Sequence, residues 1–374
     1  MGSTRDIGRF RPHRVWLGQM ACALLLCLIL AAPNGAQAEM VQHNAYFATQ
    51  TTTASNGAII EEAVINGPPT PPEGFVRMEA NMAAATENAA ITVLNEVPAF
   101  TWCFGCSATS AAMMAGHLDR TGYPNLYTGP TNNGVMVLNN DDHWSTWTDP
   151  GGDTRNRCPL SATQQGLDGR TTRGGVDDYW YQYNSSIDPF TEGGGWTEHT
   201  LGGSTGDYMR TNRYAAPSQN TDGSTTFYNY TNGAVFTAAA AVSNGVTGKS
   251  GMYGLKLFFE SRGYTVTEAY NQYIYGYNGN TQGFTFDDFK AVIDSGFPLL
   301  VQVQGHTMLG LGYNADTEDI YIHDTWDHTT HTMPWGGTYS GMDMYAVTVV
   351  KLDPDEREAT ANVIPAANLL LLGQ

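Results

Sequence analysis

A cysteine at the start of an apolar stretch is the residue of this sequence best placed to do covalent chemistry. Cys106 follows Gly105, which can form a turn, and precedes a run of alanine and methionine that ends at Gly116. The run is apolar on all sides and rich in helix-forming residues, so it predicts a buried helix with Cys106 in its first turn. Unpaired backbone N–H groups and the positive end of the helix dipole favour a thiolate at that position. We therefore expect Cys106 to act as a nucleophile.

A nucleophilic thiolate needs a base that takes its proton, and the base needs a partner that orients it. His306 begins one predicted strand and Asp324 ends the next, with the polar turn residues 314–318 between them. If the two strands are antiparallel neighbours, the position opposite His306 is near residue 326, and Asp324 is its diagonal neighbour. A shift of one residue would turn the carboxylate to the other face. The spacing therefore permits a Cys106, His306 and Asp324 triad.

Other histidines and carboxylates in the sequence raise the alternative that these residues bind a metal ion. A dense group near the predicted triad comprises His323, Asp324, Asp327, His328 and His331. No pair in it has the spacing of a recognised zinc motif, so no metal ligand is assigned. Asp141, Asp142, Asp149 and Asp153 offer hard oxygen ligands for calcium, but without the spacing of a ligand loop we interpret them as a solvated loop. His117, eleven residues after Cys106 on the same predicted helix, is interpreted as structural.

The first residues of the chain predict export. A basic stretch of four arginines between residues 5 and 14 precedes an apolar core at 20–32, and Ala36-Gln37-Ala38 offers a cleavage site. This pattern predicts a signal peptide over residues 1–38 and no stable membrane anchor after its removal. The formal net charge of −18 argues against nucleic acid or an anionic membrane as a partner. We expect a secreted or periplasmic protein that needs no cofactor.

Three cysteines remain beyond the predicted signal peptide: Cys103, Cys106 and Cys158. In an oxidising compartment two of them are expected to pair. A bridge between Cys103 and Cys158 would leave Cys106 free as a nucleophile, whereas a bridge between Cys103 and Cys106 would form a redox pair. The disulfide pairing therefore distinguishes a protein with a cysteine nucleophile from one with a thiol-disulfide redox pair.

The remaining sequence predicts one main domain. Residues 39–90 are interpreted as an N-terminal extension with a strand or two and an extended proline-rich connector, residues 91–355 as the main domain, and residues 356–374 as a tail. A loop-rich insertion is predicted at about 130–232. Helices are predicted over 251–262 and 286–294, and strands over 299–303, 306–313, 320–324 and 345–352.

These blocks resemble a known family. Gly-Cys-Ser-Ala-Thr at the start of the helix, Gly-His-Thr-Met at the start of a strand, and Ile-His-Asp-Thr-Trp after it are similar to bacterial peptidase C39-like domains, within the papain-like cysteine peptidase superfamily. The resemblance covers roughly residues 91–352. It implies Cys106 as nucleophile, His306 as general base and acid, and Asp324 as the residue that orients it, acting on a peptide or protein substrate.

The resemblance also implies a fold and a disulfide. The fold is of the α+β class and papain-like, with a helical lobe whose buried nucleophile helix packs against an antiparallel β-sheet. A cysteine three residues before the nucleophile is often bridged downstream in this superfamily, which favours Cys103 with Cys158. One position departs from the family: a Gln that donates to the oxyanion is usual about six residues before the cysteine, and Phe100 stands there.

Two other functions fit parts of the sequence. Trp-Cys-x-x-Cys before a helix is also typical of thioredoxin-like thiol-disulfide oxidoreductases, but that interpretation leaves His306 and Asp324 without a role. A catalytically inactive C39-like domain could instead bind peptides or glycans through the aromatic residues of the middle region. These are Trp144, Trp147, Tyr179, Trp180, Tyr181 and Tyr183.

Overall fold

The computed structural model describes most of the chain between residues 39 and 354. The described residues are 39–54, 56–85, 89–102, 105–124, 126, 138–139, 146–148, 154–156, 204–211 and 223–354. The predicted signal peptide and the predicted tail lie outside these residues, as does most of the predicted insertion.

The described residues form short helices and many strands. The helices are α1 (Met82–Ala85), α2 (Cys106–Arg120), α3 (Thr205–Met209), α4 (Ala238–Ser243), α5 (Gly251–Ser261), α6 (Phe286–Asp294) and the 3-10 helix η1 (Tyr277–Gly279). The strands of the first half are β1 (Val41–Asn44), β2 (Phe47–Thr53), β3 (Ile59–Ile65), β4 (Met78–Glu79), β5 (Ile91–Val93), β6 (Thr146–Thr148) and β7 (Thr154–Asn156). Those of the second half are β8 (Thr225–Tyr230), β9 (Phe236–Thr237), β10 (Val266–Tyr273), β11 (Leu299–Val303), β12 (His306–Asn314), β13 (Asp319–His323), β14 (His331–Pro334), β15 (Thr338–Tyr339) and β16 (Met342–Leu352).

Two antiparallel sheets carry the fold. The larger has the order β4-β14-β13-β12-β11-β16-β10-β9, with β5 paired to β12 and β15 paired to β16. The smaller has the order β1-β2-β3-β8, so the strands of residues 41–65 pair with a strand from the second half of the chain. A separate pair joins β6 to β7. The α+β class with antiparallel sheets is therefore confirmed.

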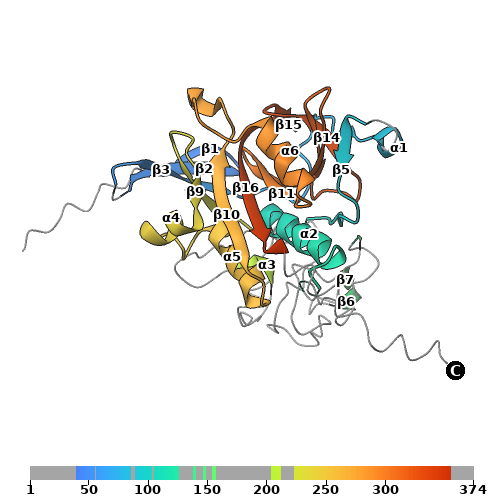
Figure 1. Cartoon of the computed structure of the whole chain (residues 1–374), viewed down its shortest axis with the longest axis horizontal. Coiled ribbons are helices and arrows are strands. Elements are labelled where there is room, and N and C mark those ends of the chain that lie inside the picture. The colour runs from blue at the N-terminus through green and yellow to red at the C-terminus, as the bar shows by residue number, and fades with distance from the viewer. Residues whose placement is uncertain are drawn as a thin grey trace, which may run out of the picture. The chain divides into compact units, whose positions relative to one another are not determined.

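Helix α2 is the buried centre of the described chain. Every residue of it except Arg120 is buried, which confirms the prediction of an interior helix. Its small side chains let it approach β12 closely: the hydroxyl of Ser107 donates to Thr307 Oγ1 at 2.8 Å, and that of Ser110 donates to the carbonyl of Thr307 at 3.2 Å. In Figure 1, α2 lies below β11 of the larger sheet, and it packs against β11 and β12. The start of α2 and the start of β12 are thereby held together.

The hairpin of β12 and β13 has one irregularity. Near the turn Asn314 pairs with Asp319, but beyond a bulge between Gly310 and Gly312 the register moves by one residue, so that Leu309 pairs with His323. A Cβ at Gly312 would stand 2.6 Å from the carbonyl oxygen of Thr92, because β5 packs closely there. Extending this register beyond the end of β13 places residue 326 opposite His306, as the sequence predicted.

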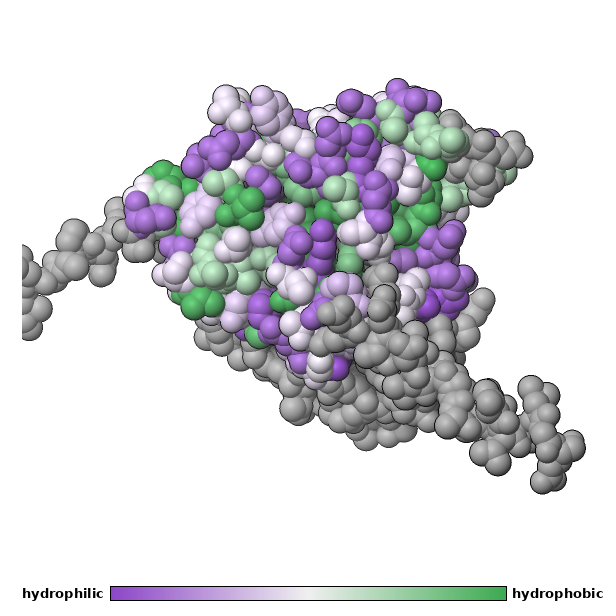
Figure 2. All heavy atoms as spheres, viewed as in Figure 1, coloured by the Kyte–Doolittle hydropathy of each residue, from purple (hydrophilic) through white to green (hydrophobic). Residues whose placement is uncertain are grey.

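The face drawn in Figure 2 mixes polar side chains with small apolar patches, and no single apolar area dominates it. Among the described residues, no helix is both long and apolar enough to cross a membrane.

A test of this packing is offered by Gly254 in α5. A Cβ at this residue would stand 1.9 Å from the carbonyl oxygen of Tyr208 in α3, so we expect Gly254→Ala to lower the free energy of unfolding by about 1–3 kcal/mol. Without that close contact, alanine would stabilise the helix by about 1 kcal/mol. Denaturant unfolding measures the sign, and a more stable variant would contradict this packing. Glu260→Ala, on the exposed side of α5, is the control and should change stability by less than about 0.5 kcal/mol.

Candidate active site

Cys106 stands at the first position of α2 and is a free cysteine with no solvent-exposed surface. The chain enters the helix through Gly105, whose φ of 130° lies in the region that favours glycine. A Cβ at Gly105 would also lie 2.7 Å from the carbonyl oxygen of Gly223. The sharp entry into the helix therefore requires glycine directly before the nucleophile.

His306 faces the sulfur from the first position of β12. The Cys106 Sγ and the His306 Nδ1 each lie 2.4 Å from the point where a Cβ at Gly67 would stand, so the two atoms are no more than twice that distance apart. The ring has no exposed surface, and its Nδ1 has no nitrogen or oxygen partner among the described residues. The backbone N–H of the next residue, Thr307, donates to Sγ at 3.3 Å.

These neighbours determine the charge of the sulfur. Burial by itself would raise the pKa of the Cys106 thiol, because it disfavours the charged form. The charge of the His306 imidazole and its hydrogen bond to the sulfur lower that pKa, and so do the backbone N–H groups of Thr307 and Gly67. The net result is a pKa below the ordinary value of a cysteine. The thiol of Cys106 is therefore more acidic than that of a free cysteine.

The other ring nitrogen fixes the tautomer of His306. Nε2 lies 2.7 Å from the backbone carbonyl oxygen of Asp324 and 3.3 Å from Thr325 Oγ1. A carbonyl oxygen can only accept, so Nε2 carries the hydrogen and donates it. Nδ1 is then left with a lone pair directed at the thiol. This is the arrangement that a general base requires.

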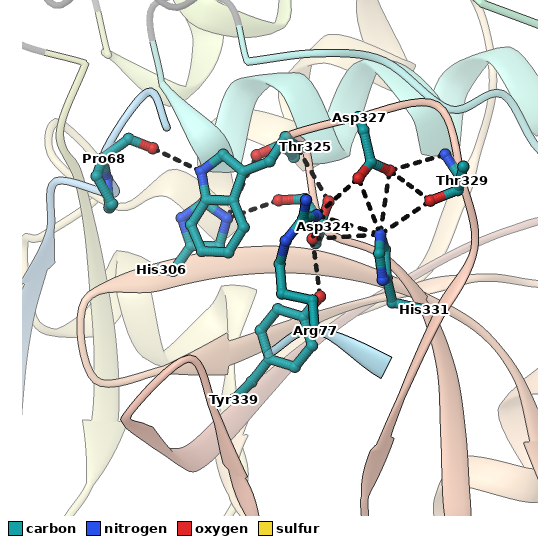
Figure 3. Close-up of polar contacts among 10 residues, drawn as sticks. Pro68, Arg77, His306, Asp324, Thr325, Asp327, Thr329, His331 and Tyr339 are labelled. Atoms are coloured by element: carbon teal, nitrogen blue, oxygen red, sulfur yellow. Dashed lines mark hydrogen bonds and ion pairs between the residues drawn. The ribbon is translucent and has the colours of Figure 1, made fainter. Parts of the chain in front are cut away.

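The carboxylate of Asp324 makes its hydrogen bonds on the far side of this loop. Its Oδ2 accepts from the hydroxyl of Tyr339 at 2.7 Å and from Arg77 Nη1 at 2.5 Å, and its Oδ1 accepts from the backbone N–H of Trp326 at 3.0 Å (Figure 3). Asp324 thus meets His306 through its backbone carbonyl, while its side chain holds the loop that presents that carbonyl. Its predicted role as the orienting residue stays a prediction.

The two residues that follow Asp324, Thr325 and Trp326, also help to hold the imidazole in place. Thr325 adopts a φ of 67°, which is rare for a β-branched residue and marks a strained turn. Trp326 lies opposite His306 and stacks on it, with 4.1 Å between ring centroids and 17° between planes. The indole therefore covers one face of the imidazole and limits its rotation.

A charged cluster adjoins the site. Arg77 Nη1 lies 2.8 Å from Asp327 Oδ2 and 3.1 Å from His331 Nε2, in addition to its contact with Asp324 (Figure 3). Ligand atoms of Asp324, Asp327 and His331 lie within 4.8 Å of one another, a grouping that could hold a metal ion. In this structure the guanidinium supplies the positive charge among them. Burial would raise the pKa of Asp327, but hydrogen bonds from His331 and Thr329 lower it below its usual range.

The remaining predicted candidates are not part of this arrangement. His328 Nδ1 lies 2.7 Å from the carbonyl oxygen of Ala99, and His117 Nε2 lies 3.3 Å from that of Gly296. Both interactions bind loops to the core. Other candidates lie outside the described residues, so the bridge, the calcium loop and the aromatic site stay predictions. These are Cys103, Cys158, Asp141, Asp142, Asp149, Asp153, Trp144, Tyr179, Trp180, Tyr181 and Tyr183; the side chain of Trp147 is likewise undescribed.

Sequence reasoning missed the residues that surround the pair. Gly67, Arg77, Thr307, Trp326 and Tyr339 all contact the site or its supporting loop. Thr307 and Trp326 lie within the quoted motifs, so the predicted register could have indicated them. Gly67 and Arg77 lie far away in the sequence, and no local pattern connects them to Cys106.

A pH-dependent stability follows from His323. Its Nδ1 lies 2.8 Å from the carbonyl oxygen of Pro98, and burial lowers its pKa from 6.5 to about 4. Between these two values the unfolded chain binds a proton that the folded chain does not. The free energy of unfolding should therefore fall by about 3 kcal/mol as the pH falls through that range, and above it the effect vanishes. In His323→Gln, denaturant unfolding should show a decrease in the free energy of unfolding over this pH range that is smaller by about 3 kcal/mol than in the wild type. Equal losses in both proteins would contradict the assignment.

Comparison with known proteins finds a family similarity within the second half of the chain. Residues 235–340 match the model of the Peptidase C39 like family. The matched segment contains His306 and Asp324, and Cys106 lies before it. No curated protein and no solved structure matches the chain. The resemblance predicted from the sequence motifs is confirmed over residues 235–340, which are similar to the peptidase C39-like family.

Proposed function

We propose that the protein is a papain-like cysteine peptidase that hydrolyses peptide or isopeptide bonds, with Cys106 as nucleophile and His306 as general base and acid. The observation that carries this proposal is the buried pairing of the Cys106 sulfur with His306 Nδ1, one on a helix and the other on a strand. A lowered thiol pKa and an imidazole lone pair directed at the sulfur are the two requirements of thiol hydrolysis. The substrate is a peptide or a protein.

The proposed reaction has two halves. The Cys106 proton moves to His306 Nδ1, and the thiolate attacks the carbonyl carbon of the substrate. Nδ1 then gives its proton to the leaving amine, and a thioester remains on Cys106. In the second half Nδ1 takes a proton from water, the resulting hydroxide attacks the thioester, and the carboxylic acid leaves as the thiol is restored.

Asp324 would act as a positioning residue in this reaction. Its carbonyl oxygen accepts a hydrogen bond from Nε2 of His306, and this hydrogen bond is compatible with both the neutral and the charged ring. Its carboxylate, tied to Tyr339 and Trp326, keeps the loop in place. In a typical triad a carboxylate oxygen accepts the hydrogen bond from the imidazole, whereas here the backbone carbonyl oxygen does so. Both arrangements fix the same tautomer.

Tyr345 is a candidate for the missing oxyanion donor. Phe100, at the position where the family carries Gln, is buried and apolar. The Tyr345 hydroxyl is fully buried, interacts electrostatically with Cys106 and has no hydrogen-bond partner in the described part of the chain. Burial, followed by the charge of Glu61, raises the pKa of Tyr345, so the group stays an O–H donor. The backbone N–H of Cys106 would be the second donor.

Two alternatives receive less support. A thioredoxin-like oxidoreductase is not favoured, because Cys106 carries a free thiol that faces an imidazole. An inactive binding domain would not need a lowered thiol pKa. Secretion or a periplasmic location in bacteria is proposed from the predicted signal peptide alone.

The thiol pKa gives the first test. Alkylation of Cys106, followed against pH by mass spectrometry, should reach half its maximal rate below about pH 8.5, the ordinary value. In His306→Ala only burial and the backbone N–H groups remain, so the midpoint should move up by one unit or more. His117→Ala is the control, because that ring lies at the other end of α2. An unshifted midpoint in His306→Ala would exclude His306 as the base.

Turnover of an unfolded protein substrate tests the reaction itself. We expect Cys106→Ala and His306→Ala each to lower kcat/KM by at least about 10³-fold, since either loss removes covalent catalysis. No hydrolysis by the wild-type protein under any condition would favour the inactive binding domain.

The oxyanion assignment has a separate readout. Tyr345→Phe should lower kcat by about 10²- to 10³-fold while the alkylation rate of Cys106 stays unchanged, because a donor to the oxyanion acts only after attack. Tyr277→Phe, in the same aromatic cluster, is the matched control and should retain activity. Full activity in Tyr345→Phe would contradict this assignment.

A further inference from the structure

A segment of the protein's own chain crosses the reactive pair. It runs from Asn66, directly after β3, to Arg77, directly before β4, and we call residues 66–77 the strap. Gly67 and Pro68 are buried where the strap passes the site, whereas residues 73–76 are exposed to solvent. The strap thus joins the smaller sheet to the edge of the larger one by a path over the active site.

Gly67 touches both reacting atoms. Its backbone N–H lowers the pKa of the Cys106 thiol. A Cβ on Gly67 would lie 2.4 Å from that sulfur, 2.4 Å from His306 Nδ1 and 3.0 Å from Cys106 Cβ. No side chain fits there without displacing one of the two groups. The space into which a substrate carbonyl must enter is therefore filled by the strap.

Polar contacts hold the strap on both sides of Gly67. The backbone N–H of Asn66 donates to the carbonyl of Tyr46 at 2.9 Å. The indole N–H of Trp326, the residue that stacks on His306, donates to the carbonyl of Pro68 at 2.9 Å. The strap is thus held through its backbone next to the nucleophile, where the backbone of a peptide substrate would have to lie.

The far end of the strap is held by charge. Arg77 enters the cluster of Asp324 and Asp327, and its guanidinium carbon lies 5.8 Å from the centroid of the Trp326 ring. Between this anchor and Pro68 the strap is poorly buried: Phe75 is 54% and Val76 is 87% exposed. The strap is therefore fixed at its ends and open to attack in its middle.

Closure by the strap explains why neither reacting group reaches solvent. Cys106 and His306 each have a relative exposure of 0%. A hydrolase in this state protects its thiolate but cannot bind a substrate. Four of the five residues 68–72 are proline, whose fixed φ restricts the backbone and favours a rigid occupant.

We propose that the strap fills the substrate cleft and holds the enzyme latent until the strap is cut or displaced. The proposal rests on the proposed peptidase function, but the occlusion of Cys106 can be tested independently of that function. Activation needs only hydrolysis of one peptide bond in the exposed residues 73–76 by another protease, which releases the chain on either side of the cut.

The test replaces residues 70–76 by the recognition sequence of a site-specific protease. The alkylation rate of Cys106 is measured by mass spectrometry before and after the cut, and hydrolysis of an unfolded protein substrate is measured in parallel. We expect the cut to raise the alkylation rate at least about tenfold and to raise turnover with it. The control carries the same sequence in place of residues 315–318, the exposed turn between β12 and β13, where a cut should leave both rates unchanged.

A second variant needs no cut. Gly67→Ala places a methyl group against the sulfur and the imidazole, so the strap should lift and the uncut protein should be alkylated faster than the wild type. Arg77→Ala should act in the same direction by releasing the far anchor. Thermal unfolding of each variant confirms that it is folded.

The outcomes separate the two proposals. An alkylation rate that is the same before and after the cut, and the same in Gly67→Ala as in the wild type, overturns the strap. Substrate hydrolysis that is measurable and equally fast in the cut and uncut proteins overturns it as well, while leaving the peptidase function in place. Faster alkylation without any turnover supports the strap and overturns the peptidase function.

Discussion

Three hydrogen bonds between Thr307 and helix α2 determine where the reactive groups stand. Ser107 and Ser110 donate to the side chain and the carbonyl of Thr307, and the backbone N–H of Thr307 donates to the Cys106 sulfur. Because His306 is the neighbour of Thr307, the same contacts that bind the helix to the strand place the imidazole at the thiol. The pairing therefore depends on the packing of the core and needs no flexible loop to bring the two groups together.

Burial has two opposite effects on this pair. It disfavours a thiolate, and it strengthens the interaction of the thiolate with a nearby imidazolium and with backbone N–H groups. The second effect prevails at Cys106, whose pKa is lowered. The strap contributes to both, since Gly67 covers the sulfur and its N–H lowers the pKa of the thiol. Occlusion of the site and activation of the nucleophile are thus produced by the same contact.

Much of the core could be predicted from the sequence because its signals are local. The helix that follows Cys106, the helix at 286–294 and the strand at 299–303 have the bounds or burial that their apolar patterns predicted. The triad was harder, because the bulge at Gly310 and Gly312 and the strained Thr325 decide which atom of Asp324 meets His306. A pattern of residue types places Asp324 near His306 but cannot tell its carbonyl from its carboxylate.

Long-range pairing explains what the sequence could not predict. β2 is rich in threonine and has no apolar alternation, so its place in a sheet comes from pairing with β3, and β3 in turn pairs with β8 about 165 residues later. The position of Gly67 depends on this sheet and on the Arg77 anchor together. The family match begins at residue 235, so it includes the imidazole but neither the thiol, which the helix pattern predicted, nor the strap, which only the structure shows.

The most direct measurement of the central claim is the ¹⁵N NMR spectrum of the His306 ring in the wild-type protein and in Cys106→Ala. The account predicts a hydrogen on Nε2 in both proteins, slowed in exchange by its bond to the Asp324 carbonyl, and an Nδ1 resonance that changes when the sulfur is removed. An Nε2 without hydrogen, or an Nδ1 indifferent to the loss of the sulfur, would contradict it.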